Sequence, residues 1–122
     1  PPLPAVAAAA GALLLALALG LSAGAMATNP WFEGTVRLQP GQRVVDAGPY
    51  ARVRHPGYAA LAPWALAPPL LLRSRAAFPP AAFPVAWVVL RTVLEDALLR
   101  RGLDGYAAYA ARVRSRLVPG VW

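Results

Sequence analysis

The only histidine of the chain lies in the segment Arg54-His55-Pro56-Gly57-Tyr58, where a polar stretch meets an apolar one. Proline is favoured in the first turn of a helix, so Pro56 predicts a helix start with His55 near its cap position. The free N–H groups of a helix start can bind a carboxylate or a phosphate. The same residues also fit an interfacial histidine that is bonded to a backbone carbonyl, and this segment alone does not separate the two interpretations.

A second group of ionisable residues, Arg91, Glu95 and Asp96, follows the last apolar run of the chain. Arg91 and Glu95 are four residues apart, which places them on one face of a helix. Ionisable groups at the edge of a membrane are costly and often functional, so these three are candidates for a site. The alternative is a structural ion pair at the membrane interface.

The residue types that the chain lacks exclude several kinds of chemistry. It has no cysteine and one histidine, which excludes a disulfide framework, a cysteine nucleophile and a multi-histidine metal site. It has no Gly-x-Gly sequence, so the phosphate-binding loop of a Rossmann-type domain is absent. We therefore expect no metal and no soluble-type nucleotide domain.

The composition indicates a membrane protein. Of the 122 residues 58% are hydrophobic and 14% are charged, and all 12 basic residues are Arg, which gives a net charge of +7. Such a basic balance indicates nucleic acid or an anionic membrane surface as the partner, and the small share of charged residues favours the membrane. The single Met is Met26, so we interpret the chain as a fragment that lacks an upstream part.

Three apolar runs predict a single all-α membrane domain, 1–122, with three transmembrane helices. Residues 1–28 form one long span, for which a secretory signal is the alternative. Residues 29–56 form an ordered loop rich in turn signals. Residues 57–94 form a helical hairpin that turns at 73–75, for which a buried hairpin of a soluble protein is the alternative. Residues 95–122 form a tail that contains an amphipathic helix.

Residue spacing predicts the inward face of two of these helices. In the first span, small residues four apart predict a face for close helix packing, at Ala8, Ala12, Ala16, Gly20 and Gly24. The last helix is expected from Asp104 until Pro119 and Gly120, lying in the membrane interface. Its apolar face comprises Tyr106, Tyr109, Ala110, Val113 and Leu117.

The arginines predict which end of the molecule faces the cytoplasm. Four lie in the loop, at 37, 43, 52 and 54, and six lie at or after 91, against two in the turn at 73–75. Cytoplasmic segments carry an excess of Arg, so the loop and the tail are predicted to lie there together. This brings His55 close to Glu95 and Asp96 on one membrane face.

Taken in order, these motifs resemble those of one enzyme family. The order is Gly-Pro-Tyr at 48–50, Arg-His-Pro-x-Tyr at 54–58, an apolar hairpin, Arg-x-x-x-Glu-Asp-x-x-Leu at 91–99, Gly at 102, Tyr-x-x-Tyr at 106–109, Val at 113 and Arg-Leu-Val-Pro-Gly at 116–120. From about residue 29 onward the chain resembles the C-terminal part of a bacterial-type isoprenylcysteine carboxyl methyltransferase, a family with phospholipid methyltransferase relatives. It departs from the family's pattern at Asp96, where a second Glu is usual, and at Ala60, where Gly is common.

The resemblance implies an integral-membrane enzyme that uses S-adenosylmethionine as methyl donor. It implies catalytic roles for Arg91 and Asp96, and a cofactor pocket at the cytoplasmic face formed by Tyr50, Arg54, His55, Tyr58, Glu95 and Tyr109. The implied acceptor is lipophilic, such as an isoprenylated cysteine carboxylate or a phospholipid amine, and it reaches the pocket from the bilayer. Methyl transfer from a sulfonium needs neither a metal nor a covalent nucleophile, which agrees with the missing residue types.

Two other functions stay open from the sequence. Membrane sterol reductases, which use NADPH, have a similar Arg-His-Pro element, although their Arg-Asp-Glu run before a Cys is not present here. A non-enzymatic, Arg-rich membrane anchor would explain the charge but not the ordered set of motifs.

Overall fold

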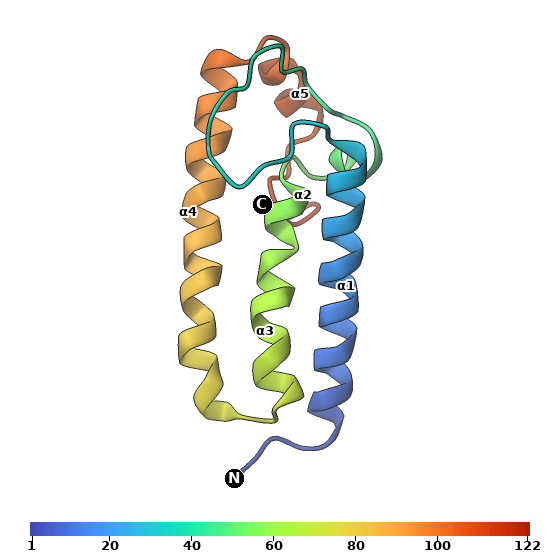
Figure 1. The fold of residues 1–122 in the computed structure, drawn as a ribbon, viewed down its shortest axis with the longest axis vertical. Helices are drawn as coiled ribbons and strands as arrows, with labels where there is room; N and C mark the ends of the chain where they lie inside the picture. The colour runs from blue at the N-terminus through green and yellow to red at the C-terminus, as the bar shows by residue number, and fades with distance from the viewer.

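The protein is entirely helical, as the sequence predicts. The computed structural model describes residues 1–122 and contains no strands. Three helices run along the long axis of the molecule, with α3 between the other two (Figure 1): α1 (Val6–Thr28), α3 (Leu61–Leu71) and α4 (Phe78–Gly102). The shorter elements are η1 (Gly48–Ala51), α2 (Pro56–Ala59), η2 (Arg75–Ala77) and α5 (Tyr106–Arg112).

Two of the helical segments are long and apolar enough to cross a membrane. They are Val6–Thr28, with a mean hydropathy of 2.2, and Arg75–Gly102, with a mean hydropathy of 1.5. Large apolar side chains on both point outward, including Leu13, which is 73% exposed, and Phe83, which is 72% exposed. Helix α3 has 11 residues and is shorter than the roughly 20 residues that a span requires. Two of the three predicted spans thus correspond to helices that could cross a membrane, and the three-span topology stays a prediction.

Helix α1 packs closely against α3 through Gly11. A Cβ atom at this position would lie 2.8 Å from the backbone nitrogen of Leu71 and 2.9 Å from the carbonyl oxygen of Ala67, so only glycine fits. The buried residues of α1 are Ala7, Gly11, Ala18 and Ala25, which repeat mainly at intervals of seven. Helices that lie nearly side by side keep this repeat along their seam.

The packing face predicted for the first span is therefore wrong. None of the five small residues that were expected there is buried: Ala8, Ala12, Ala16, Gly20 and Gly24. The reason is geometric, because residues four apart are rotated by about 40° around a helix with 3.6 residues per turn. A stripe of five such residues winds by about 160° and cannot follow one neighbouring helix.

The hairpin turns where it was predicted to turn. Arg73 has a positive φ of 54° between α3 and η2, and the side-chain nitrogen Nε of Arg73 donates to the carbonyl of Leu3 at 2.7 Å. Helix α4 then begins at Phe78 with two prolines in its first turn, where the missing N–H groups have no intrahelical partner to lose. It continues to Gly102, as predicted.

The loop and the tail meet at the end of the molecule opposite to this turn (Figure 1). The loop is held at two glycines: the ring of Phe32 lies where a Cβ of Gly57 would be, and Leu38 lies where a Cβ of Gly102 would be. No strand forms anywhere in the loop. The prediction that the loop and the tail gather at one end is confirmed.

The last helix is shorter than predicted, because α5 ends at Arg112 and Val113 leaves the helical conformation. The tail then turns back toward the start of α2, where the N–H of Arg54 donates to Ser115 O at 2.9 Å and the N–H of His55 donates to Arg116 O at 3.0 Å. These backbone bonds replace the helical ones that the expected continuation to Leu117 would have made. The apolar face of α5 packs against Leu99 of the protein's own core, and its place at the membrane interface stays a prediction.

Replacing Gly11 by Leu is expected to lower the free energy of unfolding by about 1–3 kcal/mol, because the new side chain collides with the backbone of α3. Denaturant or thermal unfolding in detergent micelles measures this change. Gly20→Leu is the matched control, since nothing lies within 4 Å of a Cβ at that position. Equal destabilisation by both substitutions would contradict the proposed packing.

Candidate functional site

A buried ion pair between Arg54 and Asp96 lies at the end of the molecule where the loop and the tail meet. Arg54 Nε donates to Asp96 Oδ1 at 2.8 Å and Arg54 Nη2 donates to Oδ2 at 3.0 Å, which is the strong, two-pronged geometry of guanidinium and carboxylate. The two side chains are 1% and 3% exposed. The remaining nitrogen, Nη1, donates to the carbonyls of Val113 and Arg114 at 2.9 and 2.8 Å. One arginine thus joins the loop, α4 and the tail.

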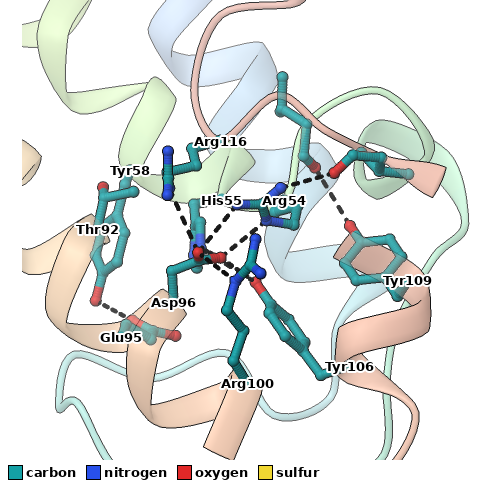
Figure 2. A network of polar contacts seen from close by, with 12 residues as sticks. Arg54, His55, Tyr58, Thr92, Glu95, Asp96, Arg100, Tyr106, Tyr109 and Arg116 are labelled. Atoms are coloured by element: carbon teal, nitrogen blue, oxygen red, sulfur yellow. Dashed lines mark hydrogen bonds and ion pairs between the residues drawn. The ribbon is translucent and has the colours of Figure 1, made fainter. Parts of the chain in front are cut away.

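Other side chains converge on the same carboxylate (Figure 2). Tyr106 of α5 donates its hydroxyl to Asp96 Oδ1 at 2.8 Å, and His55 Nε2 lies 3.2 Å from that oxygen. Arg100 and Arg116 donate to Oδ2 at 3.1 and 3.4 Å. No buried polar side-chain atom of the protein is left without a partner. Asp96 is therefore the common acceptor that joins side chains of the loop, α4, α5 and the tail.

Burial also sets the protonation of the groups around this network. Burial raises the pKa of Tyr106 well above its ordinary value, and the negative charge of Asp96 raises it further. Burial raises the pKa of Tyr109 in the same way. Burial alone would lower the pKa of Arg54, but the hydrogen bonds to Asp96 and its charge outweigh that effect and raise it. Both tyrosines are therefore neutral hydrogen-bond donors and Arg54 is a permanent cation.

A cavity lies beside this network, between the loop and the ends of the helices. It is lined by residues of the loop, of α2, of α4 and of α5. Its aromatic lining consists of Trp31, Phe32, Tyr50, Tyr58, Tyr106 and Tyr109. Its ionisable lining consists of Glu33, Arg37, Arg43, Arg54, His55 and Glu95. The cavity thus combines aromatic faces with both signs of charge.

Glu95 of α4 and Tyr58 of α2 together form one side of the cavity. The Tyr58 hydroxyl donates to Glu95 Oε2 at 2.5 Å, and the Tyr58 ring stacks against His55 with ring centres 5.9 Å apart. The guanidinium of Arg91 lies 5.5 Å from the centre of the Tyr58 ring and donates to the carbonyl of Gly34. His55 caps α2 with Pro56 in its first turn, as predicted.

The six residues predicted to bind a cofactor all line this one cavity: Tyr50, Arg54, His55, Tyr58, Glu95 and Tyr109. The two residues predicted to be catalytic, Arg91 and Asp96, do not line it. Arg91 lies behind Tyr58, and Asp96 lies inside the buried network. The structure therefore brings the six predicted cofactor-binding residues together at one cavity. The two residues predicted to be catalytic lie next to that cavity without lining it.

The sequence-based prediction missed Tyr106 and most of the loop residues that line the cavity. Tyr106 belongs to the Tyr-x-x-Tyr motif, and its spacing of three from Tyr109 indicates a shared helix face. The resemblance to the family's motifs implied a site role for Tyr109 but not for Tyr106. No local pattern indicated the tail carbonyls that bind Arg54, because backbone groups carry no sequence signal.

The comparison with protein families identifies the chain. The family described as isoprenylcysteine carboxyl methyltransferase matches residues 9–101, which is well over half of the chain. The chain belongs to this family. A search of curated proteins and a search of solved structures found no match.

Membership of the isoprenylcysteine carboxyl methyltransferase family makes the protein a membrane methyltransferase, in agreement with its two apolar helices. The comparison supports neither the sterol reductase nor the membrane anchor that the sequence left open. The matched residues end in α4, so α5 and the tail, which supply Tyr106, Tyr109 and two carbonyls to the site, lie outside the match.

Replacing Asp96 by Asn is expected to lower the free energy of unfolding by about 3–5 kcal/mol, because it leaves the buried charge of Arg54 without its counter-charge. Unfolding in detergent measures the loss. Asp46→Asn is the matched control, because its ion pair with Arg112 has side chains that are 61% and 60% exposed. Such a surface pair contributes about 0–1 kcal/mol. A small effect of both substitutions would show that Asp96 does not hold the site together.

Proposed function

We propose that the cavity binds S-adenosylmethionine and that the protein uses it to methylate a lipophilic acceptor at the cytoplasmic face of a membrane. The observation that supports this most strongly is that six residues from separate segments, chosen by their likeness to the family's motifs, line one cavity. Residues 1–122 act in this proposal as a single domain with three spans, in which the loop and the tail are cytoplasmic.

The lining of the cavity has the chemistry that this cofactor requires. S-adenosylmethionine supplies a methyl group on a positively charged sulfur, together with an adenosine, an amine and a carboxylate. The aromatic rings, among them Tyr58 and Tyr109, offer faces for the adenine and for the positive charge. Glu95 offers a carboxylate to hydroxyl or ammonium donors. His55 and Tyr50 complete the polar wall.

Within this proposal, the buried network positions the site and does not react. Arg54 and Asp96 hold the start of α2 against α4, and so fix His55 and Tyr58 relative to Glu95. Phe32, seated on Gly57, covers the cavity from the loop side and helps to exclude water. Positioning and the exclusion of water are large contributions for a displacement that needs no proton transfer.

Arg91 is the residue that we assign to the acceptor. It lies on α4 where the apolar run of the sequence ends, next to Tyr58 and outside the cavity lining. A guanidinium binds a carboxylate through two parallel hydrogen bonds, which suits the carboxyl group of an isoprenylated cysteine. The apolar surface of the neighbouring helix turns, with Val93 and Leu94 exposed, suits its hydrocarbon chain.

The full-length protein in detergent or nanodiscs is expected to bind S-adenosylmethionine and not NADPH. Replacing Glu95 by Gln is expected to weaken that binding about tenfold or more, because a charged hydrogen-bond acceptor is lost from the lining. Calorimetry measures both affinities. With methyl-labelled cofactor and an isoprenylated cysteine, the wild-type protein should form a product that releases labelled methanol in alkali, as a methyl ester does.

Arg101→Ala is the control for this experiment, since Arg101 is exposed at the end of α4 and outside the cavity lining. It should leave the affinity unchanged. Binding of NADPH without binding of S-adenosylmethionine would refute the proposed cofactor. A labelled product that is stable in alkali would keep the cofactor and replace the carboxylate acceptor by an amine.

A further inference from the structure

Three arginines line the cavity, and two of them are already bonded within the protein. Arg54 makes four hydrogen bonds, two to Asp96 and two to carbonyls of the tail. Arg37 forms a two-pronged pair with Glu33, in which Nε and Nη2 of Arg37 lie 2.8 and 3.1 Å from the two carboxylate oxygens. Each of these two guanidinium groups therefore already has a carboxylate counter-charge within the protein.

Arg43 is the third, and its side chain forms no hydrogen bond and no ion pair in the structure. Its place beside the cavity is nevertheless well defined. On one side, the turn is closed by bonds between Gln39 and Gln42: the N–H of Gln39 donates to Gln42 Oε1 at 2.9 Å, and the N–H of Gln42 donates to Gln39 O at 3.1 Å. On the other side, Val44 packs against the buried cluster around Tyr106.

The charges of S-adenosylmethionine suggest a role for the side chain of Arg43. S-adenosylmethionine has two positive groups, the sulfonium and the amine, and one negative group, the carboxylate. The carboxylate requires a cation that is not neutralised within the protein. Among the cavity-lining arginines, Arg43 alone meets this condition.

We propose that Arg43 binds the carboxylate of S-adenosylmethionine, an inference that rests on the proposed function of the cavity. Glu95, on the opposite element, then faces the cationic part of the same ligand. The loop that carries Arg43 thereby contributes binding energy as well as a cover. The sequence motifs do not include this residue, because it lies in the loop before the first of them.

Two ligands that differ only in this carboxylate test the proposal: S-adenosylmethionine and its decarboxylated form, which has the same sulfonium, amine and adenosine. Calorimetry on the full-length protein should show that the wild type binds the first about tenfold or more tightly than the second. Arg43→Ala should remove this preference by weakening only the binding of S-adenosylmethionine. Arg43→Lys should keep part of the preference, because the charge remains.

Arg52→Ala is the matched control, an exposed arginine of the same loop that does not line the cavity. It should keep the full preference for the carboxylate. If Arg43→Ala keeps that preference too, or weakens both ligands equally, the role assigned to Arg43 is wrong while the proposed cofactor stands. If the wild-type protein binds neither ligand, the proposed function fails, and the role of Arg43 fails with it.

Discussion

The buried ion pair between Arg54 and Asp96 is the interaction on which the rest of the site depends. Its partners are 42 residues apart in the sequence, and their meeting joins the loop to α4. A buried pair is stable only when its remaining hydrogen-bonding capacity is also used, since both charges have lost their water. Here Tyr106, His55 and two tail carbonyls supply those bonds. The pair therefore orders three separate segments at once.

This constraint explains why two neighbouring carboxylates of α4 have different surroundings. Successive residues of a helix point about 100° apart, so Glu95 and Asp96 cannot face the same space. Asp96 is buried in the network, whereas Glu95 lies in the wall of the cavity with Tyr58. The Asp at 96 places a short acidic side chain at the crowded position. In our proposal Asp96 holds the site together and Glu95 contacts the ligand.

Features that depend on charge, on turns and on hydrophobic length could be predicted from the sequence. The apolar lengths predicted α1 and α4, and the arginine distribution predicted that His55 and Glu95 would lie at the same end. These two predictions rely on properties that residues carry wherever they are placed. The resemblance to the family's motifs selected six residues that all line the cavity.

Features that depend on a partner far away in the sequence could not be predicted. The Ala-rich composition of α1 offers several small-residue faces, and only the position of α3 selects the one at Gly11. The end of α5 at Arg112 reflects the backbone bonds of Arg54 and His55 to the tail, which no helix propensity at residues 113–117 reveals. The role that we propose for Arg43 is similar, because it follows from the ion pairs that Arg37 and Arg54 already form within the protein.

The most direct test of this account is an experimental structure of the protein in lipid with S-adenosylhomocysteine, the product form of the cofactor. The account predicts that the ligand lies in the cavity between the loop and α4, next to Tyr58 and Glu95, and that Arg54 stays paired with Asp96. A ligand bound outside this cavity, or an Arg54 that leaves Asp96 to contact the ligand, would contradict it.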